Sequence, residues 1–530
     1  MQRFYCRKFR RKEAEKDCLV VDKPYILSHN KTMKSLRDYQ KESIKVSLKS
    51  SKGIICLPTG SGKTTIQSNI LIEDIKKNPG HQVYLVLAPR IVLSYQLMKE
   101  YFKDINDAGI QCWYAGVHSG GKTDTNEFEE ARNGDIDFQD IQVTTNSFTL
   151  REEIAKSQMR NLPIVIFGTY HSADRASVAM GSIPFGTVIC DEAHYLVSDQ
   201  FEDLILVDGL KTNRIIFFTA TMQNTSSDSG KGMNNQDRFG RVLLQRTPRE
   251  MIEAGYMVRP RMHVIRFDQD LDKEELIKSA GRVVEEAFNQ HEYISKRTGK
   301  IFVTVTGVPM MKSIMESKEI KNLQKRKGAS VYAVASDSSI GNDIDGVKYS
   351  RQEFLSRLKS DGANPSKEMI ILHIDILTEG IDVPGITGIL PFRSLKKSKF
   401  VQTLGRASRV SPDDLDAFKA GEYTHHDLGE MLKPYAWVMF PDIDGEDTSA
   451  DIIGLVNELR TYGFNPTEDV FISNERGQMP PVTLMDPLTE TDTRSSALQE
   501  ALEEMRHRIE SEEIASLIEG ESLEEMFGHF

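Results

Sequence analysis

The sequence has few cysteines and tryptophans and no long apolar segment. Five cysteines and two tryptophans occur in 530 residues, and no two cysteines form a C-x-x-C pair. So few scattered cysteines predict neither a disulfide framework nor a structural zinc site, which fits a reducing compartment. No run approaches the roughly 20 consecutive apolar residues of a membrane-spanning helix. We therefore expect a protein that does not work in a membrane.

The chain is also short of positive charge. Its net charge is −11, from 67 basic and 78 acidic residues, which argues against a surface coated with nucleic-acid-binding residues but not against a local basic channel. Residues 1–33 form a basic extension without the apolar core of a secretory signal, so we expect a cytoplasmic rather than an exported protein. The end of the chain is rich in glutamate at helical spacing, which predicts a solvated face or, alternatively, a docking surface for a protein partner.

Short apolar runs rich in β-branched residues alternate with longer helical patterns. The runs are GIICLP, QVYLVLAP, IVIFGT, TVICDE and IIFFTAT in the first half, and KIFVTVT, SVYAVAS, MIILHID and ITGILPF in the second. Runs this apolar, bounded by turn residues and separated by helices, predict buried parallel strands. We therefore predict an α/β fold with two tandem domains, residues 34–247 and 248–442, each built on a parallel sheet, followed by a mainly helical region, residues 443–530.

Two segments compete for the role of a phosphate-binding loop. Gly116 to Thr123, GVHSGGKT, matches the pattern G-x-x-x-x-G-K-[ST] at every specified position, whereas Leu57 to Thr64, LPTGSGKT, has leucine in place of the first glycine. A phosphate loop needs a buried strand that ends in a tight turn, followed by a helix whose first N–H groups point at the anion. Only Leu57 to Thr64 has this context. Gly116 to Thr123 is followed by acidic residues, which compete with a phosphate for a helix N-terminus.

We therefore predict that a nucleotide binds at the segment that departs from the strict pattern. Leu57 is then the last buried residue of the strand, and the turn begins one position later. The predicted nucleotide-binding residues are Thr59, Gly60, Ser61, Gly62, Lys63, Thr64 and Thr65.

The run TVICDEAH places two carboxylates and a histidine directly after an apolar strand. A nucleotide phosphate needs a carboxylate at a neighbouring strand end to hold Mg²⁺, and a base for the attacking water. We predict that Asp191 holds the metal together with Thr64, and that Glu192 is the base. His194 is predicted to sense the state of the reaction, and a further strand end, TAT, offers Thr219 and Thr221 for coupling.

The order and spacing of these motifs resemble those of the superfamily 2 helicases. The motifs that carry the resemblance are LRDYQ (36–40), LPTGSGKTT (57–65), LVLAPR (85–90), VIFGTYHSA (165–173), DEAH (191–194), TAT (219–221), HIDILTEGIDVP (373–384) and QTLGRASR (402–409). In character they are similar to the DNA-directed members related to the motors of type I and type III restriction enzymes. The resemblance implies two RecA-like domains that bind ATP and Mg²⁺ and couple ATP hydrolysis to movement along DNA, or to its unwinding, in replication, recombination or repair.

The resemblance also implies that both domains contribute to the ATP site. In the first domain, Gln40 would read the adenine. The second domain would contribute Gly380 and Asp382, with Arg406 and Arg409 as arginine fingers. Gln402 would join His194, Thr219 and Thr221 in coupling the site to the rest of the protein. A planar, permanently charged donor suits the charge that builds on a transferring phosphoryl group. An arginine from the second domain would make hydrolysis depend on domain closure.

A nucleic-acid track along the strand ends is the last implication of the resemblance. Contacts in such a track go mainly to phosphate and sugar. Its predicted residues are Arg90, Thr169 and Tyr170 in the first domain, and Thr304 and Thr378 in the second. Gly120, Gly121 and Lys122 of the rejected segment are a further candidate contact with a nucleic-acid phosphate, with a plain surface loop as the alternative.

Other functions fit the same motifs. The leading prediction is an ATP-dependent DNA helicase or translocase. An RNA helicase is the first alternative, because the same engine acts on both polymers. A motor subunit of a larger nucleic-acid-processing complex is another. A regulatory protein with an inactive ATPase site is disfavoured by the intact lysine, carboxylates and arginines.

Overall fold

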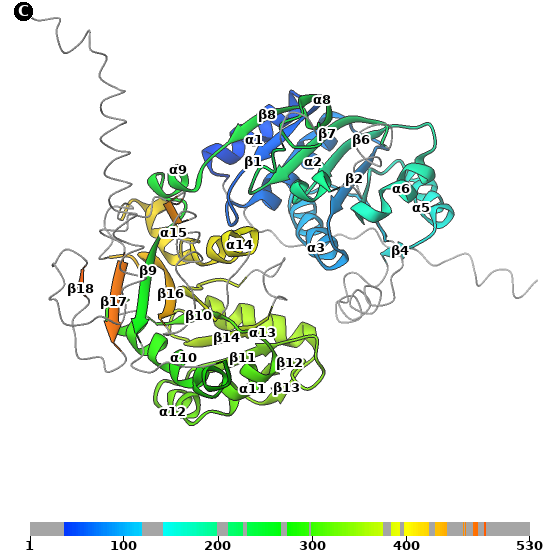
Figure 1. Ribbon diagram of the computed structural model, residues 1–530. Coiled ribbons are helices and arrows are strands. Elements are labelled where there is room, and N and C mark those ends of the chain that lie inside the picture. Colours follow the sequence, from blue (N-terminus) through cyan, green and yellow to red (C-terminus); the bar gives the residue numbers. More distant parts are fainter. Residues whose placement is uncertain are drawn as a thin grey trace, which may run out of the picture.

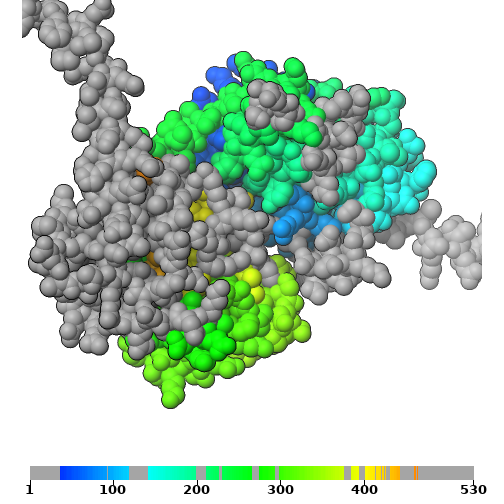
Figure 2. Space-filling view, in the orientation of Figure 1, coloured from blue at the N-terminus to red at the C-terminus, as the bar shows by residue number. Residues whose placement is uncertain are grey.

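The computed structural model forms two α/β domains (Figure 1). It describes residues 36–118, 141–198, 210–225, 230–266, 273–295, 298–374, 383–392, 397–422, 424, 430–442, 459–460, 462, 470–474 and 482–483. In Figure 2 the surface of the first domain runs from blue to green and that of the second from green to yellow, on opposite sides of the view. No helix in these ranges is long and apolar enough to cross a membrane.

The first domain is built on an eight-stranded parallel sheet in the order β4-β3-β5-β2-β6-β7-β1-β8. Its strands are β1 (Lys52–Cys56), β2 (Val83–Ala88), β3 (Trp113–Val117), β4 (Gln142–Thr144), β5 (Ile164–Thr169), β6 (Phe185–Cys190), β7 (Thr212–Thr219) and β8 (Arg241–Gln245). Its helices are α1 (Asp38–Leu48), α2 (Lys63–Lys77), α3 (Ile91–Asp107), α5 (Ser147–Met159), η2 (Tyr170–Ser172), α6 (Ala173–Met180), η3 (Ala193–Val197) and α8 (Gln236–Phe239).

Successive strand residues of this sheet pack into two different hydrophobic clusters. Ile55 and Phe218 belong to one cluster, whereas their neighbours Ile54 and Phe217 belong to the other. Adjacent side chains of a strand point to opposite faces, so both faces of the sheet are covered. This is why the strands read as continuous apolar runs rather than as alternating patterns.

The second domain is built on a ten-stranded sheet in the order β13-β12-β11-β14-β10-β15-β16-β9-β17-β18. Its strands are β9 (Arg259–Arg266), β10 (Lys300–Thr304), β11 (Ser330–Val334), β12 (Asn342–Ile344), β13 (Val347–Lys348), β14 (Met369–His373), β15 (Gly388–Pro391), β16 (Tyr435–Asp442), β17 (Val470–Asn474) and β18 (Val482–Thr483). Its helices are α10 (Lys273–Ser295), α11 (Val308–Glu316), α12 (Lys318–Lys327), α13 (Arg351–Ala363), α14 (Lys397–Ala407) and α15 (Pro412–Ala420). The central pairs are parallel, and antiparallel pairs occur only towards the two ends of this described sheet.

All nine apolar runs form strands, which confirms the predicted α/β fold. Runs that the sequence did not single out, such as β3, β8 and β16, complete the sheets. The second sheet also extends past Asp442, because β17 pairs with β9 in parallel, with Val470 opposite Met262. The prediction of a mainly helical region from residue 443 onwards therefore misses two strands. An edge strand has unpaired N–H and C=O groups, so β9 would be open to pairing on one side if β17 were not there.

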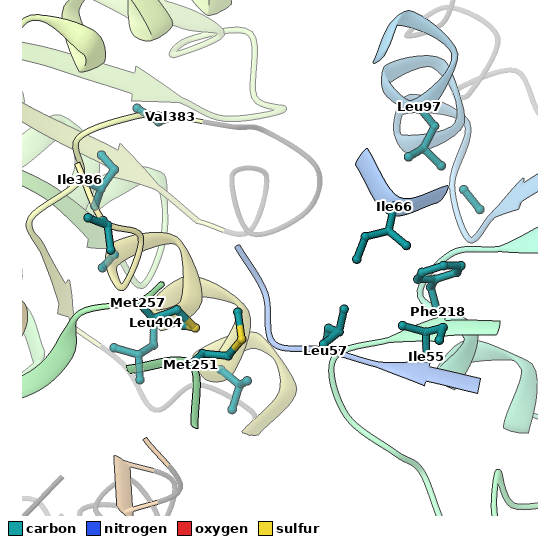
Figure 3. Close-up of a cluster of buried hydrophobic side chains, with 14 of the residues drawn as sticks. Ile55, Leu57, Ile66, Leu97, Phe218, Met251, Met257, Val383, Ile386 and Leu404 are labelled. Carbon is teal, nitrogen blue, oxygen red and sulfur yellow. The ribbon is translucent and has the colours of Figure 1, made fainter. Parts of the chain in front are cut away.

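A short segment with helix α9 (Pro248–Glu253) connects the domains. The Thr247 hydroxyl accepts a hydrogen bond from the Glu250 N–H, while the Glu250 carboxylate accepts one from the Thr247 N–H. This reciprocal cap starts the helix where the sequence placed the junction. In Figure 3, Met251 and Met257 of this segment lie next to Leu404 of α14. The three side chains are at most 3% exposed and belong to the same cluster as Leu57.

Candidate nucleotide site between the domains

The turn between β1 and α2 has the backbone of an anion-binding loop. Gly60 and Gly62 have φ angles of +87° and +79°, in the left-handed region that favours glycine. Gly62 precedes α2, and no side chain caps that helix N-terminus, nor does an acidic residue lie in its first turn. The first N–H groups of α2, from Lys63, Thr64 and Thr65, therefore meet the requirements for binding an anion.

Leu57 lies where the sequence places it. It is fully buried, and its N–H continues the pairing of β1 with β7 by donating to the Thr219 carbonyl at 3.0 Å. The ammonium of Lys63 folds back over the turn and donates to the Leu57 carbonyl at 3.3 Å. A phosphate in the loop would offer this lysine a charged partner in place of that carbonyl.

The alternative segment differs already at its first glycine. Gly116 lies inside strand β3, between its partners on β4 and β5, rather than in a turn. His118, just after the strand, is buried, and its carbonyl accepts a hydrogen bond from Arg175. Gly120, Gly121 and Lys122 lie outside the described residues.

Helix α1 packs against the turn through two neighbouring side chains. The Gln40 amide donates to the Ser61 carbonyl at 3.3 Å, and the Tyr39 hydroxyl donates to the same carbonyl. Gln40 also accepts a hydrogen bond from the Arg37 N–H at 3.0 Å. The structure thus places Gln40 on the phosphate loop, and its predicted contact with adenine stays a prediction.

Asp191 and Glu192 follow β6, which is separated from β1 by β7 alone. The Asp191 carboxylate accepts a hydrogen bond from the Gln67 amide at 2.7 Å. Burial, followed by the negative charge of Glu192, raises the pKa of Asp191 to about 7, although Lys63 and Gln67 oppose the shift. A positive charge close to this carboxyl group would therefore stabilise its ionised form.

Gln67 is a site residue that the sequence analysis missed. It is fully buried on α2, four residues after Lys63, and its amide oxygen accepts a hydrogen bond from the Tyr101 hydroxyl at 3.3 Å. Residues four apart lie on one face of a helix, so the spacing from Lys63 was an available signal. The partner of Gln67, Asp191, follows a different strand, so the hydrogen bond between them could not be predicted from the residues around Gln67.

Glu192 has a left-handed backbone with a φ of +49°. This conformation costs about 1–2 kcal/mol for an L-residue other than glycine, so the surrounding fold holds it. Its Oε2 atom is buried and accepts no hydrogen bond from a described residue. The same atom lies 3.5 Å from Nδ1 of His194. A buried carboxylate oxygen with an open acceptor position is the chemistry that a general base requires.

His194 connects this carboxylate to the end of β7. Its Nδ1 lies 3.2 Å from the Thr219 hydroxyl, which in turn donates to the Thr221 carbonyl at 2.8 Å. Burial lowers the pKa of His194, although the Glu192 charge opposes the shift. The structure therefore brings together three of the four residues predicted to couple the site to the rest of the protein.

The second domain reaches the phosphate loop through helix α14. A Cβ atom placed on Gly405 would lie 2.6 Å from Cβ of Thr59, and one placed on Gly60 would lie 2.9 Å from the Gly405 carbonyl oxygen and 3.1 Å from Nε of Arg409. Only glycines permit this approach, because Cβ atoms are not found at such distances from backbone. Arg409 is therefore in direct contact with the loop. Figure 1 shows α14, which ends two residues before Arg409, between the two sheets.

The other residues predicted in the second domain have different outcomes. Arg406 is buried at 7% exposure and Gln402 is half-buried, both on α14. Gly380, Asp382 and Thr378 lie outside the described residues. The connecting segment holds the end of α14 through a hydrogen bond from the Val258 N–H to the Ser408 carbonyl at 2.8 Å and a β-bridge between Met257 and Arg409.

Three of the predicted nucleic-acid contacts are corrected by the structure. Tyr170 is fully buried and its hydroxyl donates to the Asp191 carbonyl. The hydroxyls of Thr169 and Thr304 are also buried, at 3.2 Å from the Ser172 hydroxyl and from Nε2 of His373, respectively. These side chains support the strand ends rather than face a polymer. Arg90 is exposed, directly before α3.

Comparison with known protein sequences gives helicase relatives. Residues 33–224 match the family model described as the type III restriction enzyme, res subunit. The chain is 22% identical over 262 residues to a probable helicase of African swine fever virus, covering 48% of this chain and 27% of the relative. It is 45% identical over 64 residues to the DNA 3'-5' translocase XPB2 of Sulfurisphaera tokodaii, covering 12% of this chain and 14% of the relative. The matched part is thus about a quarter of the viral relative.

Comparison with solved structures gives restriction-modification enzymes. The fold is similar to that of the ATP-dependent type ISP enzyme LlaBIII bound to DNA, with a TM-score of 0.63 and 16% identity, over 89% of this chain and 33% of that one. A nuclease-deletion mutant of the type ISP enzyme LlaGI with a DNA substrate mimic gives a TM-score of 0.53 and 17% identity, over 82% of this chain and 30% of that one. This likeness shows that the two-domain fold is shared.

Proposed function

Because this chain belongs with the superfamily 2 helicases and is related to the motor subunits of restriction enzymes, we propose that it hydrolyses ATP to move along nucleic acid or unwind it. DNA is the proposed polymer. The observation that supports this most directly is the contact of Arg409 and Gly405 with the phosphate loop. A hydrolytic site that needs parts from two domains can convert domain closure into movement.

The proposed division of work starts with the phosphates. The first N–H groups of α2 and the Lys63 ammonium bind the β- and γ-phosphates. Arg409, with Arg406 beside it on the chain, stabilises the charge that builds on the γ-phosphoryl group. Glu192 accepts the proton of the attacking water through its open Oε2 position.

The donor set fits Mg²⁺. Asp191 and the Thr64 hydroxyl would hold the ion, which supplies charge neutralisation on the phosphate oxygens when it is bound. The part of the chain that the structure describes contains no cluster of three or more metal-binding side chains. Mg²⁺ suits such a site, because it is usually bound through one or two carboxylates, substrate phosphates and water. The raised pKa of Asp191 fits the same view, since a cation would offset the cost of its burial.

The polymer is proposed to lie across the strand ends of both domains. Arg90 is the exposed candidate in the first domain, and Thr306 is exposed before α11 in the second. Contacts of this kind go to the sugar-phosphate backbone and carry no sequence preference. A protein partner on the acidic region near the end of the chain is proposed from its charge alone, since that region lies outside the described residues.

The proposal is tested by measuring ATP hydrolysis without polymer and with single-stranded DNA, duplex DNA and RNA. We expect stimulation by DNA and a loss of about a hundredfold or more in kcat in Lys63→Ala, because one preorganised phosphate donor is removed. Lys41→Ala is the matched control, since this lysine lies on α1 with an exposed side chain. Stimulation by RNA alone would replace DNA by RNA as the polymer. Full activity of Lys63→Ala would refute the site.

A further inference from the structure

A cavity of about 260 Å³ lies at the edge of the second sheet where its parallel strands begin. Lys300 is the first residue of β10, Thr387 directly precedes β15, and Lys433 precedes β16 by one residue. All three line the cavity. The volume is below that of pockets for drug-sized ligands, so only a small molecule or ion fits.

Two buried lysines line this cavity. Lys300 and Lys433 are each 4% exposed. Lys300 donates to the carbonyls of Gly362 and Asn364, both at 2.6 Å, and Lys433 donates to the Arg409 carbonyl at 2.5 Å. Neither lysine forms an ion pair with a carboxylate in the described ranges. Buried charges in proteins are usually paired, so two lysines with only neutral partners are unusual.

Capping of helices explains part of this arrangement. The carbonyls of Gly362 and Asn364 lie at the end of α13, and that of Arg409 follows the end of α14. Basic side chains suit such positions because the carbonyls there lack helical partners. However, the three hydrogen bonds use three of the six N–H groups that two ammoniums carry. Among the described residues, no acceptor is found for the other three N–H groups, and both lysines line the cavity.

The rest of the cavity wall carries hydroxyl groups and one carboxylate. Ser411 caps α15, and Asp413 in the first turn of that helix opposes an anion. Thr298 and Thr387 also line the cavity, and the Thr387 hydroxyl donates to the Lys300 carbonyl at 3.2 Å. Burial lowers the pKa of Lys300 to about 8 and, together with the charge of Arg409, lowers the pKa of Lys433 to about 7. The charges of Asp361 and Asp414, respectively, oppose these shifts. Both ammoniums would therefore be stabilised by a negative charge in the cavity.

We propose that this cavity is a binding site for a small oxyanion of the phosphate class, held by Lys300 and Lys433. No part of the ATP site is needed for this binding. A second consequence does rest on the proposed function: the anion would lie one hydrogen bond from the Arg409 carbonyl. An anion that draws the Lys433 ammonium towards itself would weaken that hydrogen bond and alter the contact between Arg409 and Gly60.

The site is tested by calorimetric titration of inorganic phosphate into the full chain, against chloride at equal ionic strength. All proteins carry Lys63→Ala, so that phosphate binding to the loop of the first domain does not contribute. On this background we expect one saturable site. Lys433→Met should weaken phosphate binding about tenfold or more, because a charge-assisted donor is lost. Lys321→Met, on the exposed face of α12, should leave the affinity unchanged.

Asp413→Asn provides a variant that does not touch the buried lysines. Asp413 is exposed at the cavity wall, so removing its negative charge should tighten phosphate binding about two- to fivefold. This arm decides the matter if Lys433→Met does not fold. Absence of saturable binding, or equal affinity in all the variants, would overturn the proposal. Competition by a DNA oligonucleotide would identify a polymer phosphate as the occupant, and lack of competition would identify free phosphate.

Discussion

The two domains share a parallel α/β sheet but place their polar groups at opposite edges. In the first domain the phosphate loop, Asp191 and Thr219 all follow the carboxyl ends of strands. In the described part of the second domain, Thr304 and His373 at the carboxyl ends of β10 and β14 are buried against each other. The residues that reach the candidate nucleotide site come instead from the end of α14 and the residues just after it, at Gly405 and Arg409.

This difference indicates that the two domains, although similar in fold, have different roles at the candidate site. The first domain would hold the phosphates, the metal and the water in a rigid frame of strand ends. The second domain would add a cation, Arg409, just after the end of α14, where the connecting segment holds the chain through Met257 and Val258. Residues fixed in one domain are suited to binding the nucleotide. A residue supplied by the other domain is suited to making hydrolysis depend on the relative position of the two domains.

Arg409→Ala should lower kcat for ATP hydrolysis about a thousandfold, because the transition state loses its planar cation. ATP affinity should change much less, since the phosphate loop is intact. Steady-state kinetics and nucleotide binding measure the two effects separately. Arg357→Ala is the control, because Arg357 stacks on Tyr349 away from the site. A kcat within threefold of the parent would end the assignment of the cation to the second domain.

Glu192→Gln should lower kcat about a hundredfold while ATP still binds. The amide keeps the shape of the side chain but loses its basicity. Single-turnover hydrolysis separates the chemical step from product release. Glu73→Gln, on the exposed surface of α2, is the matched control. Unchanged single-turnover rates would move the role of base to another group.

Asp191→Asn should stabilise the protein at pH 8 in the absence of Mg²⁺, by on the order of a few kcal/mol. The native pKa of about 7 lies above the ordinary value of 3.8. Stability from this group is therefore fully present below about pH 4 and is lost as the pH rises through 7. The difference between variant and parent should vanish near pH 4, as measured by denaturant unfolding. Asp38→Asn, almost fully exposed, is the control. A pH-independent difference would contradict the raised pKa.

Tyr256→Ala should have the smallest effect, a loss of about 1 kcal/mol in unfolding free energy and a modest rise in KM for ATP. Tyr256 of the connecting segment packs on Tyr39 with ring centroids 5.1 Å apart, and Arg37 lies 5.1 Å above its ring. Tyr349→Ala removes a similar arginine–aromatic contact elsewhere in the second domain. Only the first variant should alter KM. Equal KM values in both variants would show that Tyr256 does not connect the two domains at the ATP site.

The sequence was sufficient where the signal is local. Nine apolar runs predicted nine strands. The choice of Leu57–Thr64 over Gly116–Thr123 also rested on local context, since a strand, a turn and a helix must follow one another. Gly116 in the middle of β3 shows why the stricter match lacks that context at its first glycine.

The sequence was insufficient where a side chain's role depends on a distant partner. Tyr170 and Thr169 stand at a strand end, as a polymer contact should, yet the Tyr170 hydroxyl is committed to the Asp191 carbonyl. Gln67 was missed for the same reason, because its partner Asp191 is 124 residues away. Motif position specifies where a backbone lies in the sheet, but not towards which neighbour a side chain turns.

The order of apolar runs and turns along the chain was thus enough to predict two largely parallel sheets and the turn between β1 and α2. Only the tertiary structure decided that Gly405 and Arg409 touch Gly60, and that Lys300 and Lys433 meet at one cavity. Hydrophobic periodicity and turn residues determine structure over a few neighbouring residues, so they can be recognised from the sequence alone. Contacts between domains and the burial of charge depend on how complete sheets pack, and they exist only once the chain has folded.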